Sequence, residues 1–140
     1  MEFSEWATGI VNGRVLDSKP IPDGEKITAV EVKVQAGYGI IDINFHSTNS
    51  TTNWVTGNNE QGWFEKEVVN PKLKMIGLRV RLQSGFGIVD VQVIYKDNTY
   101  SDWITKINEG EIRSTVLSEN VTGIQVREQA GFGIVDLRLF

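Results

Sequence analysis

One nonapeptide is written three times in this chain. Its copies are QAGYGIIDI, QSGFGIVDV and QAGFGIVDL, beginning at residues 35, 83 and 129. The third residue of each copy is a glycine, and these glycines lie 48 and 46 residues apart: Gly37, Gly85 and Gly131. A fixed period of this length is typical of folds assembled from repeated units, so the sequence predicts three units of similar structure.

A tryptophan series has the same period and interleaves with the first. It consists of SEWATG, TNWVTG and SDWITK, centred on Trp6, Trp54 and Trp103. The chain stops where a further tryptophan segment would follow, and it begins with such a segment. We therefore expect residues 1–140 to form a single domain in which the N-terminal segment completes the third unit. That closure would leave fewer free sheet edges.

Each unit has the alternation of short antiparallel strands. In ITAVEVKVQ, Val30, Val32 and Val34 fall on one face of the strand, and polar residues occupy the other. IIDINF alternates likewise, and TTNWVT and WFEKEVV supply two more candidate strands. Turn residues interrupt the chain too often for a helix, so four strands per unit are expected.

The alternation also sets the register of the hairpin. If Val34 pairs with Ile41, the loop is Ala36 to Gly39, and Lys33 lies opposite Asp42 on the outer face. Opposed unlike charges contribute roughly 0.2–1 kcal/mol. The other copies repeat the arrangement, with Arg81 opposite Asp90 and Arg127 opposite Asp136. The three aspartates are therefore expected to form exposed cross-strand ion pairs.

The composition argues against several classes of function. A net charge of −4 disfavours nucleic-acid binding, which needs a basic face. The absence of cysteine excludes disulfides and thiolate metal sites. No secretory signal is visible, and a disulfide-free domain fits the cytoplasm or export, so the localisation stays open. Met1-Glu2-Phe3 is either a natural start or the remnant of a trimmed chain.

The three units resemble β-prism proteins of the jacalin and vitelline membrane outer-layer type, more closely the latter. The matching residues are Val32 to Gln35, Gly37-Tyr38-Gly39, Trp54 and Gly62-Trp63, with their repeats. The resemblance implies a three-fold pseudo-symmetric, all-β prism of three four-stranded antiparallel units. The rival fold is a β-trefoil, whose usual Gln-x-Trp signature is missing.

The chain departs from both relatives. The vitelline family has many disulfides and a polar stretch where this chain has Ile40-Ile41-Asp42. Jacalin-type lectins use a Gly-x-x-x-Asp loop, whereas Gly39 is one residue too close to Asp42 and Gly37 one too far.

Catalysis and metal binding find little support. His46 is the only histidine and occurs in one unit of three. An ion-paired carboxylate has a lowered pKa, which suits neither a general acid nor a base at neutral pH. One Asp per unit beside a basic residue is a poor calcium site. No helix follows the Gly-x-Gly pattern to bind a dinucleotide. We expect no enzyme, no cofactor and no metal.

The aromatic residues are the more interesting candidates. Tyr38, Phe86 and Phe132 stand between glycines at the loop tips, where they either meet a sugar or lipid surface or fold back over the core. The three tryptophans are expected to contribute to the core, although polar neighbours could frame a hydroxyl-rich ligand. The candidate ligand-binding residues are Gly37, Tyr38, Gly39, Asp42, Gly85, Phe86, Gly87, Asp90, Gly131, Phe132, Gly133, Asp136, Trp6, Trp54 and Trp103.

Three functions stay open. The resemblance implies a non-enzymatic carbohydrate-binding module, with glycans or glycoconjugates as partners at up to three equivalent sites. This function is inferred from the resemblance in fold, and one fold can carry many different functions. The alternatives are a membrane-contacting or toxin-associated module that uses the aromatic loop tips, and a structural or coat protein.

Overall fold

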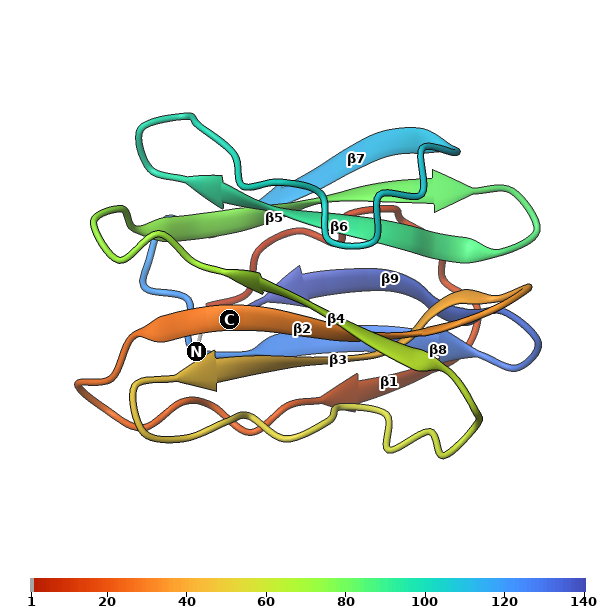
Figure 1. The fold of residues 1–140 in the computed structure, drawn as a ribbon, viewed down its shortest axis with the longest axis horizontal. Coiled ribbons are helices and arrows are strands. Elements are labelled where there is room, and N and C mark those ends of the chain that lie inside the picture. Colours follow the sequence, from red (N-terminus) through yellow and green to blue (C-terminus); the bar gives the residue numbers. More distant parts are fainter. Residues whose placement is uncertain (1) are drawn as a thin grey trace.

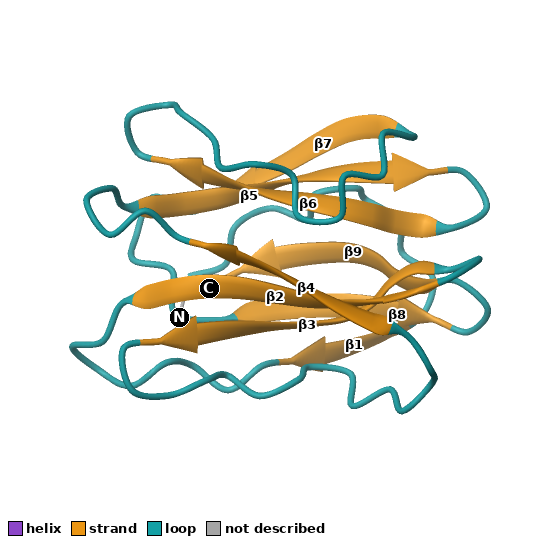
Figure 2. Cartoon of the chain, in the orientation of Figure 1, coloured by secondary structure: helices purple, strands orange, loops and turns teal. Residues whose placement is uncertain are grey.

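The computed structural model describes residues 2–140, which form nine strands and no helix (Figure 2). Met1, one of the three residues whose origin the sequence leaves open, lies outside the described part. The strands are β1 (Arg14–Asp17), β2 (Ile27–Gln35), β3 (Gly39–Ser47), β4 (Trp63–Val68), β5 (Met75–Gln83), β6 (Gly87–Tyr95), β7 (Glu111–Val116), β8 (Ile124–Gln129) and β9 (Gly133–Leu139). Residues 2–140 contain no helix long and apolar enough to cross a membrane.

The strands form three antiparallel sheets, one for each repeat, and the fold is a β-prism rather than a trefoil. Unit 1 has the strand order β3-β2-β4, unit 2 has β6-β5-β7, and unit 3 has β9-β8-β1. The three hairpin turns lie together at one end of the molecule, at the right in Figure 1. We call this the hairpin end. The loops 18–26, 69–74 and 117–123 lie at the other end.

Segments from both ends of the described chain build the third sheet. β1 pairs with β8 from Arg14↔Glu128 to Asp17↔Gln125. The segment before β1 runs along β9, because Ser4 N donates to Leu139 O at 2.8 Å and Ala7 N donates to Leu137 O at 2.9 Å.

The inner faces of the sheets enclose one apolar core. The alternation predicted for β2 is confirmed, since Val30, Val32 and Val34 are all buried. Leu78 and Val80 from β5 and Ile124 and Val126 from β8 occupy matching places. Each Å² of apolar surface that is buried stabilises the fold by about 25 cal/mol, so this core is the main source of stability.

The expected register of the hairpin is right at its aspartate and wrong at its tip. Lys33 lies opposite Asp42, as predicted, but Val34 pairs with Ile40 rather than Ile41. The reason is a β-bulge, which places two residues of β3 against one of β2. Because of the bulge, both Ile40 and Ile41 are buried, and a strict alternation would have turned one of them outward. The same shift occurs between Arg81 and Leu82 and between Arg127 and Glu128.

The expected fourth strand of each unit is an irregular segment. In unit 1, Thr52 N donates to Phe45 O at 2.9 Å and Val55 N to Ile43 O at 3.2 Å, so three residues of the segment span two of β3. The hydroxyl of Thr52 accepts the N–H of Phe45 at 2.9 Å and replaces a backbone carbonyl in the ladder. Ser101 and Ser4 accept in the same way in units 2 and 3.

The glycines that end the three turns hold the units together around the pseudo-three-fold axis. A Cβ on Gly39 would lie 2.9 Å from Ile88 O of unit 2. A Cβ on Gly87 would lie 2.8 Å from Ile134 O of unit 3, and one on Gly133 would lie 2.8 Å from Ile40 O of unit 1. All three glycines also have φ near +90°, which penalises a side chain. Each unit therefore packs its turn against the bulge of the next.

Candidate functional site

The hairpin end carries two depressions, one on each side of the β8–β9 turn. The larger, of about 610 Å³, lies between this turn and that of unit 2, and we call it the Phe132 depression. The smaller, of about 250 Å³, lies between the β8–β9 turn and that of unit 1, and we call it the Tyr38 depression. Small-molecule sites are typically clefts of about 300–1,000 Å³, so the Phe132 depression has a suitable size.

Both depressions combine an aromatic ring with polar side chains from two units. The lining of the Phe132 depression includes Asn12, Gln83, Ser84, Gln129 and Phe132. The lining of the Tyr38 depression includes Gln35, Tyr38, Asn58, Glu60 and Gln129. Amide, hydroxyl and carboxylate groups supply the donors and acceptors that fix a ligand's orientation.

The loop-tip aromatics are neither fully solvated nor part of the core. Tyr38 is 36% exposed, while Phe86 and Phe132 are half-buried. Phe86 lines neither depression at the hairpin end. Gly85, Gly87, Gly131 and Gly133 also line these depressions. The structure thus brings two of the three predicted aromatics next to polar side chains and leaves the third apart.

The repeated aspartates are not exposed ion pairs, and that prediction is wrong. Asp42, Asp90 and Asp136 are all buried. Within residues 2–140, none forms an ion pair with the basic residue across the strand. Lys33 Nζ instead donates to Asn58 O at 3.0 Å. The reason is the neighbouring tryptophan segment, whose backbone N–H groups bind the carboxylate, as Thr56 and Gly57 bind Asp42 and Thr8 and Gly9 bind Asp136.

In units 1 and 3 the aspartate forms what we call the aspartate clamp. Asp136 Oδ1 accepts the N–H groups of Thr8 at 2.7 Å and Leu137 at 2.8 Å, and Oδ2 accepts that of Gly9 at 2.8 Å. Asp42 is bound in the same way by backbone N–H groups on both of its oxygens. These contacts engage both oxygens of each carboxylate and explain the repeat of Asp as a structural device.

The tryptophans are not core residues either. Trp6, Trp54 and Trp103 are half-buried on the outer faces of the sheets. The next residue of the irregular segment points inward instead in units 3 and 2, so Ala7 and Ile104 contribute to the core. Each tryptophan and the residue after it are both apolar, so the sequence does not indicate which of the two points into the core.

Arginines cover two of the three indoles. The guanidinium of Arg127 lies 4.8 Å, and that of Arg138 4.5 Å, from the centre of the Trp6 ring. Arg81 lies 4.8 Å and Arg79 5.7 Å from the Trp103 ring. Such cation–π contacts contribute roughly 0.5–2 kcal/mol each. The basic residues expected to pair with the aspartates therefore stabilise the outer faces through aromatic contacts.

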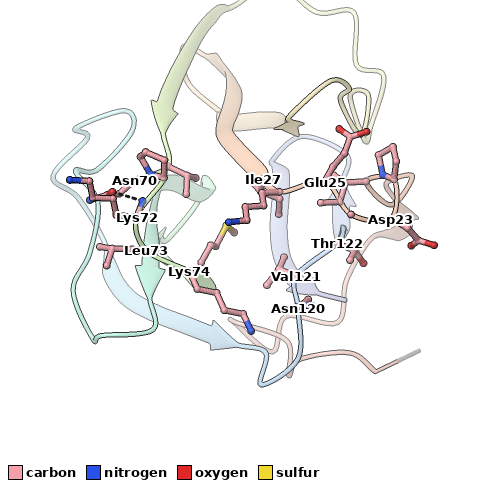
Figure 3. Close-up of a pocket in the computed structure, with 17 residues that line it drawn as sticks. Asp23, Glu25, Ile27, Asn70, Lys72, Leu73, Lys74, Asn120, Val121 and Thr122 are labelled. Atoms are coloured by element: carbon pink, nitrogen blue, oxygen red, sulfur yellow. Dashed lines mark hydrogen bonds between the residues drawn. The ribbon is translucent and has the colours of Figure 1, made fainter.

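The end opposite the hairpins also has a depression, of about 550 Å³ (Figure 3). Asp23 and Glu25 lie on one side of it, with Lys72 and Lys74 on the other (Figure 3). Hydrogen bonds from Asn49 N and the Ser47 hydroxyl lower the pKa of Glu25. No aromatic ring is among the described residues that line this depression. It therefore lacks the apolar, flat partner that the two depressions at the hairpin end provide.

The described residues hold no cluster that could bind a metal ion beside these depressions. Among residues 2–140, no group of three or more His, Asp or Glu side chains could hold a metal ion. The single histidine, His46, has its Nε2 2.8 Å from Glu31 Oε1 on the outer face of unit 1.

The polar side chains of the depressions were missed by the sequence analysis. Gln35, Gln83 and Gln129 are conspicuous in sequence as the first residue of each nonapeptide, and that position was a usable signal. Asn12, Asn58 and Glu60 come from the segments that follow the tryptophans, which differ from unit to unit. Nothing in a single sequence indicates that these segments lie beside the turns.

Comparisons with known proteins identify the fold. Neither the protein-family profiles nor the curated protein sequences give a match. Solved structures do match. Calsepa lectin, in complex with a bisected glycan, has a TM-score of 0.69 at 14% identity over 99% of this chain and 95% of that one. A prostate-specific glycoprotein lectin has a TM-score of 0.67 at 15% identity over 97% of this chain and 96% of that one.

A mannose-specific jacalin-related lectin from Morus nigra, in complex with mannose, has a TM-score of 0.63 at 14% identity over 99% of this chain and 92% of that one. At such identities the likeness concerns the fold and not the binding residues. It covers nearly the whole of each chain. This chain therefore has the β-prism fold seen in the jacalin-related lectins.

Proposed function

We propose that the protein is a non-enzymatic carbohydrate-binding module whose principal site is the Phe132 depression. Structural neighbours described as lectins in complex with mannose or another glycan support this function. The observation that carries it is the lining of the depression, where one aromatic ring stands beside amide and hydroxyl groups. A pyranose needs an apolar surface for its C–H face and hydrogen-bonding groups for its hydroxyls.

The Tyr38 depression serves as a second, smaller site on the other side of the same turn. Its polar residues include two glutamates. Glu60 would accept hydrogen bonds from ligand hydroxyls, whereas Glu128 Oε1 already accepts from Arg14. The two sites differ in volume and lining, so they would bind different sugars or different residues of one glycan. Two weak sites on one rigid body gain about 10²–10⁴ in avidity when both engage a multivalent surface.

A glycan array tests the function directly. We expect the wild-type protein to bind a defined set of glycans, and Phe132→Ala with Gln83→Ala to lose that binding while the fold is retained. Asn120→Ala is the matched control, because Asn120 lines the depression at the opposite end. Binding that survives the double substitution, or that is lost in the control, would contradict this placement of the site.

Liposome co-sedimentation tests the membrane-contacting alternative. Of the loop-tip aromatics only Tyr38 is exposed, while Phe86 and Phe132 are half-buried, so replacement of all three by Ala should not change lipid association. Strong sedimentation of the wild-type protein that this triple variant abolishes, together with no bound glycan, would overturn the proposed function.

A further inference from the structure

The depression at the end opposite the hairpins, of about 550 Å³, has no part in the proposed function, and we call it the loop-end depression. The loops 18–26, 69–74 and 117–123 join the strands of successive units, and all three contribute to its lining. Its floor consists of apolar side chains that are partly or fully buried: Ile21, Ile27, Val69, Leu73, Met75 and Val121. None of these side chains is aromatic, so the floor suits a flexible aliphatic chain rather than a flat ring.

Charged side chains lie on two opposite sides of the loop-end depression. The acidic side carries Asp23 and Glu25, and the basic side carries Lys72 and Lys74 (Figure 3). Lys26 also lines the depression. Within residues 2–140, none of these charged groups belongs to an ion pair. The two sides therefore do not neutralise each other by direct contact, and a ligand that carries both charges can bridge them.

Hydrogen bonds hold the Glu25 carboxylate of the acidic side in position. Glu25 Oε1 accepts the N–H of Asn49 at 2.8 Å and the hydroxyl of Ser47 at 2.7 Å. The bond from Asn49, and then that from Ser47, lower the pKa of Glu25, so its carboxylate is ionised at neutral pH. Both contacts use Oε1, which leaves Oε2 of this partly exposed side chain to accept from a ligand.

Hydrogen bonds also fix the backbone that carries the basic side. Asn70 Oδ1 accepts the N–H of Lys72 at 2.9 Å, and Asn70 O accepts that of Leu73 at 3.1 Å. Lys74 O accepts the N–H of Lys96 at 2.8 Å, which ties the loop to the end of β6. Lys72 and Lys74 are both exposed, so their ammonium groups extend into solvent from an anchored backbone.

We propose that the loop-end depression binds a ligand with an ammonium group at one end of an aliphatic chain and a carboxylate at the other. The ammonium group donates to the acidic side, the carboxylate accepts from the basic side, and the chain covers the floor. The α-ammonium and carboxylate of an amino acid share one carbon atom, so they cannot reach both sides. A lysine at the C-terminus of a peptide has suitable spacing between its ε-ammonium and carboxylate, and so has a free ω-amino acid.

NMR titration of the isotope-labelled protein with 6-aminohexanoate tests the site. We expect this probe to shift the Met75 methyl group and the amides of Val121 and Thr122, which line the depression. Hexylamine and hexanoate each carry one of the two charges. Each should bind about fivefold more weakly, because it loses an ion pair at a partly exposed site. Equal affinity for all three probes would overturn the inference, and so would shifts confined to the hairpin end.

Two variants separate the contributions of the two sides. Glu25→Gln keeps the length of the side chain and an acceptor for Ser47 and Asn49, but it removes the negative charge. It should weaken the binding of 6-aminohexanoate and hexylamine without weakening that of hexanoate. Lys72→Gln combined with Lys74→Gln should weaken the binding of 6-aminohexanoate and hexanoate without weakening that of hexylamine.

The matched controls remove the same charges from exposed residues that do not line the depression. They are Glu119→Gln for the acidic side, and Lys19→Gln combined with Lys96→Gln for the basic side. We expect both controls to bind the three probes as the wild-type protein does. A loss in a control as large as that in its matched variant would assign the effect to net charge and overturn the inference.

Nα-acetyl-lysine distinguishes the two sources of this ligand chemistry. If it binds more tightly than 6-aminohexanoate, the ligand is the end of a peptide chain, and if it binds more weakly, the ligand is a free ω-amino acid. Nα-acetyl-lysine amide lacks the carboxylate, so tighter binding of the amide than of the acid would contradict the role of the basic side. The inference does not rest on carbohydrate binding, so an empty glycan array would refute the proposed function and leave this site intact.

Discussion

Replacing the clamp aspartates by asparagine should affect the three units unequally. In Asp136→Asn, the amide oxygen can keep the N–H groups of Thr8 and Leu137, now as neutral hydrogen bonds. The amide NH₂ would face the N–H of Gly9, so one charge-assisted bond is lost and two donors oppose each other. Hydrogen bonds to charged groups contribute about 1.5–3 kcal/mol, and a buried unsatisfied donor costs about 1–3 kcal/mol. Part of this is offset because the charge is no longer buried, which leaves a net loss of about 2–4 kcal/mol.

Asp90→Asn should cost about 1 kcal/mol or less, because its amide NH₂ can take the place of the unpartnered oxygen. Asp42→Asn should resemble Asp136→Asn, since both oxygens of Asp42 are bound. Urea unfolding followed by tryptophan fluorescence at neutral pH gives the three values, provided that the m-value stays constant. Equal losses in all three variants, or the largest loss at Asp90, would refute the reasoning.

Three further predictions follow from the turns, the irregular segments and the buried carboxylate. Gly133→Ala should lower the melting temperature far more than Gly131→Ala. Both glycines have φ +84° to +90°, but only at Gly133 does an added Cβ meet Ile40 O, at 2.8 Å; equal effects would rule out the packing argument. Ser101→Ala should cost about 1–2 kcal/mol in urea unfolding, because the N–H of Val93 loses its hydroxyl acceptor; a neutral result would mean that water replaces the hydroxyl. Lys106→Gly should stabilise the protein, because Lys106 has φ 61°, which glycine adopts without strain. Burial raises the pKa of folded Asp90, so the folded state binds a proton more readily than the unfolded chain, and wild-type stability from this group rises as the pH falls toward about 3.9. Thermal melts of Lys106→Gly that show no gain over the wild-type protein would contradict the strain argument, and wild-type melts that show no gain on acidification toward that pH would contradict the titration argument.

The repeat and the strand alternation made the fold predictable from sequence. The spacing of the nonapeptides predicted three units, and the alternation at Val30, Val32 and Val34 predicted which face of β2 is buried. The register at Lys33 and Asp42 followed from the same pattern. All of these are local consequences of a two-residue period.

The errors arose where the backbone leaves that period. A bulge inserts one residue and buries Ile41 beside Ile40, and strand alternation alone cannot indicate it. Asp42 keeps its predicted partner but is buried by the tryptophan segment that binds its carboxylate. The irregular segments use the Thr52 hydroxyl in place of a carbonyl, which made a strand reading of TTNWVT wrong. The depressions depend on which segments from different units meet, and that is a tertiary property.

The glycine contacts around the pseudo-three-fold axis have a consequence for assembly. Each turn glycine packs on the bulge of the following unit, in the order Gly39 to unit 2, Gly87 to unit 3 and Gly133 to unit 1. A single unit cut from the chain would present a turn without a partner and a bulge without a turn. These contacts do not require the units to be covalently linked. They require only that the turn of each unit pack against the bulge of another similar unit. The same interface, repeated by a rotation, is the kind that closes a symmetric homotrimer.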